Sequence, residues 1–142
     1  MADKLSLEVV TPFRTVLNED VDSVTLPGIE GEMGILPEHV PLLTTLDAGI
    51  MSYVNGNGKK QAIAVHWGYA QVDGNNVRVL AELAETASEI DLSRAQEAEK
   101  KAKELLQSGK QSSSDWEDEE GRQNIYERKL QRSLVRQKVA QL

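Results

Sequence analysis

The chain has 142 residues, a formal net charge of −7 and no cysteine. The missing cysteines exclude disulfide frameworks, thiolate metal sites and cysteine nucleophiles, and the negative charge argues against non-specific binding to nucleic acid. The sequence contains no apolar run of the roughly 18 residues that a membrane span needs, and it starts with neither a signal peptide nor a transit pattern. We therefore expect a protein of the cytosol.

The first part of the chain reads as short strands joined by turns. Apolar residues alternate with other residues over 5–10, as in a half-buried strand, and residues 21–26 follow a similar pattern. Residues 55–58 (NGNG) and 73–76 (DGNN) tolerate the positive φ angles of tight hairpins. This pattern predicts an all-β unit, a sandwich or a barrel, rather than a parallel sheet.

Residues 24–41 (VTLPGIEGEMGILPEHVP) match neither the helical nor the strand period. A helix would lose about 1 kcal/mol per interior glycine and about 3 kcal/mol per proline relative to alanine, and proline removes hydrogen-bond donors from a central strand. The run is therefore predicted to be an ordered loop. Its Met and Ile side chains either tuck under the sheet or face a partner, and spacing leaves both alternatives open.

The chain beyond residue 88 has a different composition and charge. Residues 1–88 carry twelve acids and five bases, whereas residues 89–142 carry eleven of each. Residues 92–107 are helix formers with a narrow seam made mostly of alanine, and a second helical run covers about 123–141. Residues 108–121 are rich in Gly, Ser and acids, and read as a mobile connector. These features predict an antiparallel helical hairpin.

The alanine seam of this hairpin buries little area, so the pair is expected to have low stability of its own. A weakly held element can leave one surface and dock on another. The alternative is a helix pair that stays permanently docked on the first unit.

Catalytic machinery is not visible in the sequence. No nucleophile elbow, phosphate-binding P-loop or H-E-x-x-H zinc motif occurs. Acids in a loop, such as Glu30, Glu32 and Glu38, are usually solvated, and His39 and His66 are more typical of packed or hydrogen-bonded histidines than of catalytic ones. The chain is therefore predicted not to be an enzyme.

Arginines on the two predicted helices form a candidate anion site. Asp91 and Arg94 share a face at three-residue spacing, and Arg128 and Arg132 share one at four. If the helices fold back on each other, Arg132 comes within roughly one turn of Arg94, and three guanidinium groups could bind phosphate. The alternative is a solvated basic face balanced by nearby glutamates.

Five segments carry specific signatures in chain order: 24–41, 42–46 (LLTTL), 64–70 (AVHWGYA), 79–85 (VLAELAE) and 90–95 (IDLSRA). Together they resemble the epsilon subunit of bacterial rotary ATP synthases. The resemblance implies an α+β fold, with an N-terminal antiparallel β-sandwich over 1–87 and a C-terminal antiparallel two-helix hairpin over 88–142. It also implies a non-catalytic rotor subunit of the central stalk, peripheral on the cytoplasmic face of the bacterial plasma membrane and not inserted into it.

The resemblance implies a regulatory site for ATP. Residues 90–95 match the family's I(L)DxxRA motif, in which a folded hairpin holds ATP with acids toward adenine and arginines toward phosphate. ATP is expected as a regulatory ligand rather than an obligatory cofactor. The matching candidates are Glu85, Asp91, Arg94, Ala95, Arg128 and Arg132.

The resemblance also implies protein partners. The sandwich is expected to bind the gamma subunit and to rest on the c-ring, with Glu32, Met33, Glu38 and His39 at the ring contact. When ATP is scarce, the hairpin is expected to extend and to meet acidic loops of the catalytic alpha and beta subunits, which would inhibit ATP hydrolysis. The basic residues for that contact are Arg128, Lys129, Arg132 and Arg136.

Two other functions remain open from the sequence. One is a free-standing β-sandwich that binds proteins and dimerises through its helices. The other, a small hydrolase that uses His39 or His66, has little support.

Overall fold

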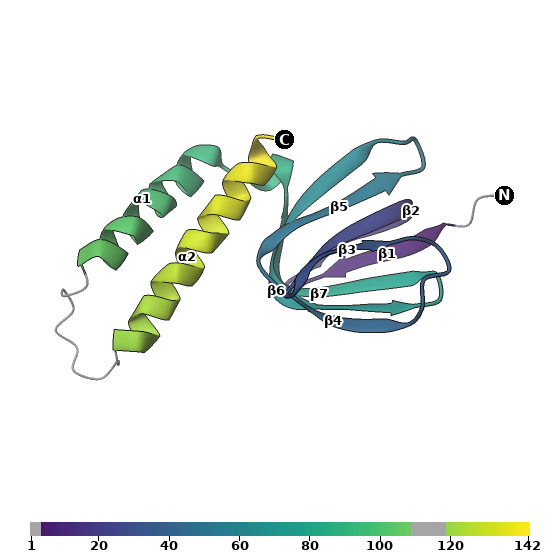
Figure 1. Ribbon diagram of the computed structural model, residues 1–142. Coiled ribbons are helices and arrows are strands. Elements are labelled where there is room, and N and C mark those ends of the chain that lie inside the picture. Colours follow the sequence, from purple (N-terminus) through teal and green to yellow (C-terminus); the bar gives the residue numbers. More distant parts are fainter. Residues whose placement is uncertain (1–3, 109–118) are drawn as a thin grey trace.

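The computed structural model describes residues 4–108 and 119–142 and places a strand unit beside a pair of helices (Figure 1). The described helices are the 3₁₀ turn η1 (Ala87–Glu89), α1 (Leu92–Ser108) and α2 (Glu119–Ala140). The described strands are β1 (Leu5–Val10), β2 (Thr15–Gly28), β3 (Gly31–Ile35), β4 (Leu42–Leu46), β5 (Gly49–Asn55), β6 (Lys60–Asp73) and β7 (Asn76–Thr86).

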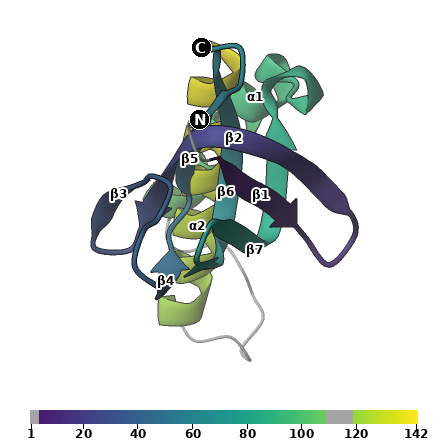
Figure 2. The same cartoon turned by 90° about the vertical axis from the view of Figure 1, so that its right-hand side faces the viewer.

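The strands form a sheet that folds over on itself into two layers (Figure 2). Their order is β1-β7-β6-β4-β2-β3, while β5 pairs with β2 and β6, and β1 also pairs with β2. All pairs are antiparallel except β1 with β7. This exception follows from the closed order, because each of these two strands is antiparallel to a neighbour and those neighbours, β2 and β6, run the same way. The predicted β-sandwich is confirmed, with one parallel pair.

Strand β6 crosses between the two layers. One strand of 14 residues runs through His66. Up to Val65 it pairs with β5, and from Gly68 onward it pairs with β4. The backbone turns at Trp67, with φ of 52°, and Gly68, with φ of 139°. The hairpins predicted at residues 55–58 and 73–76 are confirmed as the β5–β6 and β6–β7 connections.

The predicted loop over 24–41 is wrong in its first part. Strand β2 runs to Gly28 and pairs with β3, so residues 29–30 form the turn of a hairpin. Pro27 is tolerated because its missing N–H lies on the side of β2 away from β3, where the partner of β2 changes from β5 to β4. The Pro27 carbonyl, on that same side, accepts a hydrogen bond from Asp47 N–H at 3.0 Å. Residues 36–41 are irregular, as expected. Ile35 is buried under the sheet, whereas Ile29 and Leu36 are exposed.

Among the residues whose side chains the structure describes, the hairpin does not share the main hydrophobic core. Within that part of the chain the core contains only sandwich residues, among them the fully buried Leu5, Leu7 and Met51. The helices rest on the sandwich through a second, smaller cluster of Ala64, Val135 and Val139, with Ala48, Ile50 and Ile90 packed against it.

The two helices pack along each other, as the sequence predicts (Figure 1). Ala95 and Ala102 of the predicted seam are buried. Gln137 of α2 donates a hydrogen bond to Glu99 of α1 at 2.7 Å. Most of the predicted connector, including Trp116, lies outside the described residues.

Candidate functional site

A pocket of about 260 Å³ lies where the end of β7, the start of α1 and the last turns of α2 meet. It contains four of the six residues predicted to bind nucleotide. It also contains Arg136, which the sequence assigned only to the contact with the catalytic subunits. The lining residues are Glu85, Glu89, Ile90, Asp91, Arg94, Ala95, Ala98 and Arg136.

The first turn of α1 fixes two of these residues for structural reasons. The Asp91 carboxylate accepts a hydrogen bond from the Arg94 backbone N–H at 3.2 Å, so Asp91 caps the helix. Ala95 is 3% exposed and belongs to the seam between the helices, where a small side chain allows close approach. Asp91 and Ala95 are therefore explained by folding alone, whereas Arg94 is exposed at the pocket.

Glu85 links the sandwich to α2. One oxygen of its carboxylate, Oε1, lies 3.2 Å from His66 Nε2 and accepts a hydrogen bond from Arg136 Nε at 2.6 Å. Burial by itself raises the pKa of Glu85, but hydrogen bonds from His66 and Arg136, together with the charges on these two residues, hold it below its ordinary value. Glu85 is therefore kept ionised where the hairpin meets the sandwich.

The surroundings of His66 are those of a packed side chain rather than of a catalytic one. Its side chain is 1% exposed, and its Nδ1 atom is buried with no hydrogen-bond partner in the described part of the chain. The Nε2 atom faces the Glu85 carboxylate and is the ring nitrogen placed to donate to it. His66 thus serves as the donor that orients Glu85.

Arg128 and Arg132 lie further along α2. Arg128 sits 3.9 Å above the ring of Trp67 and 3.3 Å from Glu82, outside the pocket. Burial lowers the pKa of Arg132, and the charges of Arg136 and Arg128 lower it further. The predicted meeting of Arg94 with Arg128 and Arg132 is thus shifted by one turn, because Arg136 follows Arg132 by four residues and takes the place opposite Arg94.

The pocket brings cations and carboxylates together. Arg94 and Arg136 supply guanidinium groups, which are a kind of donor that binds phosphate, and Glu85, Glu89 and Asp91 supply carboxylates. Its volume lies just below the 300–1,000 Å³ that is usual for small-molecule sites. Within residues 4–108 and 119–142, no three acids or histidines gather as a metal ion requires.

The residues predicted to contact the ring lie on β3 and in the β3–β4 loop. Glu32 and Met33 belong to β3. Glu38 has a positive φ of 66°, and its backbone N–H donates to Asn75 at 2.8 Å, which ties the loop to the β6–β7 turn. His39 Nδ1 donates to the Val40 carbonyl at 2.7 Å. The structure therefore holds Glu38 and His39 in one ordered loop.

Large apolar side chains are exposed near these residues. They come from the β2–β3 turn, the β3–β4 loop and β4. Between 63% and 70% of each is accessible to solvent, which is typical of a surface that binds a partner. They are Ile29, Leu36, Val40 and Leu43.

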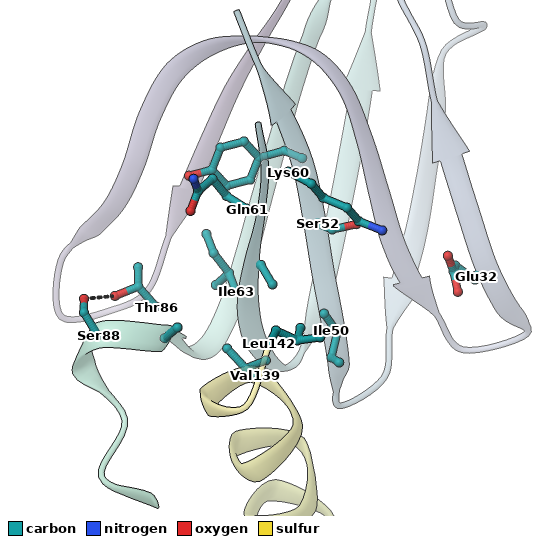
Figure 3. A pocket seen from close by; sticks show the side chains of 13 residues that line it. Glu32, Ile50, Ser52, Lys60, Gln61, Ile63, Thr86, Ser88, Val139 and Leu142 are labelled. Atoms are coloured by element: carbon teal, nitrogen blue, oxygen red, sulfur yellow. Dashed lines mark hydrogen bonds between the residues drawn. The ribbon is translucent and has the colours of Figure 1, made fainter. Parts of the chain in front are cut away.

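A larger pocket of about 610 Å³ lies beside the end of α2 and the paired strands β5 and β6 (Figure 3). Ile50 and Ile63 come from the strands, and Val139 and Leu142 come from the end of the chain. At its margin the hydroxyls of Thr86 and Ser88 are 3.2 Å apart.

The docked state is expected to weaken in acid. The pKa of Glu85 is lowered from 4.5 while Arg136 is bound to it, so the released state takes up protons more readily. The contribution of Glu85 to docking should therefore be fully present above about pH 4.5 and should be lost as the pH falls through the lowered pKa. The distance between spin labels on cysteines replacing exposed Asn18 of β2 and Lys138 of α2 measures this.

Glu85→Gln is the matched control for this titration. The amide does not titrate, so the variant should dock less at neutral pH and should show a flatter profile down to pH 3. An identical profile in the variant would show that other carboxyl groups control the release.

Comparisons with known proteins identify the family. Residues 4–87 match the family model for the ATP synthase delta/epsilon chain β-sandwich domain. The ATP synthase epsilon chain of Carboxydothermus hydrogenoformans is 56% identical over 106 residues, which are 75% of this chain and 78% of that protein. The epsilon chain of Geotalea uraniireducens is 46% identical over 140 residues, which are 99% of this chain and 96% of that one.

Solved structures agree with this assignment. A chain of the Euglena gracilis mitochondrial ATP synthase, determined with OSCP, F1 and the c-ring, superposes with a TM-score of 0.74 at 25% identity, covering 90% of this chain and 76% of that one. Across the described ranges, no helix has the length and apolar character needed to cross a membrane. The chain therefore belongs to the ATP synthase epsilon chain family, a family of non-catalytic stalk subunits.

Proposed function

We propose that this chain is a rotor subunit that joins the catalytic head of a bacterial ATP synthase to the c-ring, and that its hairpin regulates ATP hydrolysis. The observation that carries this proposal is the separation of the two hydrophobic clusters, because the hairpin can leave the sandwich without opening its core. Family membership favours this function over that of a free-standing module which dimerises through its helices.

The sandwich would supply the coupling contact. Its exposed apolar side chains lie beside the loop that carries Glu38 and His39, and Glu32 and Met33 lie on the adjoining strand. We propose that this edge meets the gamma subunit and the polar loops of the c-ring. The chain would then sit peripherally on the cytoplasmic face of the bacterial plasma membrane.

The hairpin would supply the regulation. In the docked state Arg128 and Arg136 are paired with Glu82 and Glu85 of the sandwich. Release of α2 would free these cations, with Lys129 and Arg132, for acidic loops of the alpha and beta subunits. ATP would bind between Arg94 and Arg136 and favour the docked state, so that hydrolysis is inhibited when ATP is scarce.

Calorimetric titration with ATP tests the nucleotide site. Arg136→Gln and Arg94→Gln should each weaken ATP binding by about tenfold or more, since each removes a charge-assisted hydrogen bond to phosphate. Arg78→Gln is the matched control, because Arg78 lies near the start of β7, does not line the pocket and pairs with Glu8 of β1. Equal losses in all three variants, or no heat from the natural chain at millimolar ATP, would refute this site and leave the coupling role standing.

A further inference from the structure

Trp67 occupies a position that a regular strand does not provide. Its φ of 52° lies in the region that L-residues with bulky side chains rarely adopt, and Gly68 follows with φ of 139°. Successive side chains of a regular strand face opposite sides of the sheet. Here His66 reaches Arg136 of α2 through Glu85, and Trp67 contacts Arg128 of the same helix. The bend therefore allows the consecutive side chains of His66 and Trp67 to help hold the same helix, α2.

The contact at Trp67 is specific in geometry. The Arg128 guanidinium carbon lies 3.9 Å from the centre of the ring, well inside the range for a cation–π interaction. The same group reaches Glu82 at 3.3 Å, and 44% of the Arg128 side chain remains exposed. Arg128 is thus held between an aromatic face and a carboxylate of the sandwich.

The docked helix has two main polar anchors. Arg128 and Arg136 are eight residues apart, which is about 12 Å along the helix, and Gln131 donates to Asp47 at 3.2 Å between them. The apolar cluster under α2 is small. Because little apolar area holds the helix, these anchors control how often it is docked.

We propose that Trp67 is a positioning residue, and that its contact with Arg128 sets the ratio of docked to released hairpin in the absence of nucleotide. Arg94 and Arg136 then carry the effect of ATP, and Arg128 contributes to docking only. The consequence for hydrolysis rests on the proposed function, whereas the docking ratio is a property of the chain alone.

The docking ratio is measured by the distance between spin labels at residues 18 and 138 of the full chain, with and without ATP. Trp67→Leu and Arg128→Gln should each lower the ratio by up to about tenfold, and the double variant should lower it no further than Arg128→Gln alone. The fold increase caused by ATP should stay as in the natural chain. Trp67→Phe keeps an aromatic face and should restore most of the ratio.

Phe13→Leu is the matched control, because Phe13 is an aromatic residue that is 84% exposed in the β1–β2 connection. It should leave the ratio unchanged. An unchanged ratio in Arg128→Gln, or the same fall in Phe13→Leu, would overturn the proposal. If Trp67→Leu loses the sheet signal in circular dichroism, Arg128→Gln and Trp67→Phe decide the question.

The assembled ATP synthase separates this inference from the proposed function. Arg128→Gln alters a residue assigned to inhibition, so Trp67→Leu is the informative variant and should deepen the inhibition of hydrolysis. A shifted docking ratio with unchanged hydrolysis would refute the inhibitory role but would leave the role of the Trp67–Arg128 contact in docking standing. If the ratio of the natural chain does not respond to ATP, the nucleotide role is refuted, and the measurements without ATP still test the role of that contact.

Discussion

Replacing Gly68 with alanine is expected to lower the free energy of unfolding of the sandwich by about 3 kcal/mol or more, the upper end for single substitutions. A Cβ atom at this position would lie 2.1 Å from the carbonyl oxygen of Leu80 and 2.8 Å from the Cα of Ala81. These atoms belong to the backbone of β7 and cannot move aside as a side chain can. The φ of 139° is also unfavourable for any residue with a Cβ atom.

Urea denaturation followed by circular dichroism measures this effect. Gly34→Ala is the matched control, because Gly34 lies in β3, has no atom within 4 Å of its Cβ position and should shift the stability by no more than about 0.5 kcal/mol. Similar midpoints for the two variants would show that the β6 corner adjusts freely and does not depend on glycine.

Ending the chain after residue 88 is expected to leave a folded sandwich and to raise ATP hydrolysis by the assembled enzyme about fivefold or more, a typical size for regulatory coupling. The main core contains none of the hairpin residues that the structure describes, so its packing should survive the deletion. The deletion exposes Ala64 and Ile50 and removes Arg136 from Glu85. We expect a loss of about 2 kcal/mol in stability.

Thermal unfolding of the isolated fragment and hydrolysis by the reconstituted enzyme measure the two effects. Leu7→Ala in the full chain provides a scale, since a cavity in the main core should cost about 3 kcal/mol. A fragment that fails to fold would contradict the independence of the sandwich. An enzyme that assembles with the fragment and hydrolyses ATP at the natural rate would contradict the inhibitory role.

The sequence predicts most of the fold because its signals are local. Turn residues at 55–58 and 73–76 mark two hairpins, and the helical composition beyond residue 88 marks α1 and α2. The prediction over 24–41 is wrong in part because the missing N–H of Pro27 faces the side of β2 where its partner changes from β5 to β4, and that change is set by the whole sheet. The parallel pairing of β1 and β7 likewise arises only when the sheet closes.

The candidate site is predicted less completely for a similar reason. The motif from Asp91 to Ala95 is contiguous, so the sequence carries it. Which arginine of α2 lies opposite Arg94 depends on the register between the two helices. The length of the connector does not fix that register to better than one helical turn. Arg136 could have been found by extending the four-residue spacing of Arg128 and Arg132 by one more step. The role of Trp67 depends on a backbone bend that no local sequence pattern predicts.

Native-state hydrogen exchange on the full chain tests the central claim, that a stable sandwich carries a separately released hairpin. The amides of α1 and α2 should exchange much faster than those of β1, β6 and β7, at a rate set by release of the hairpin. Trp67→Leu should speed exchange in the helices alone. Exchange of helices and core strands at one common rate would contradict the account.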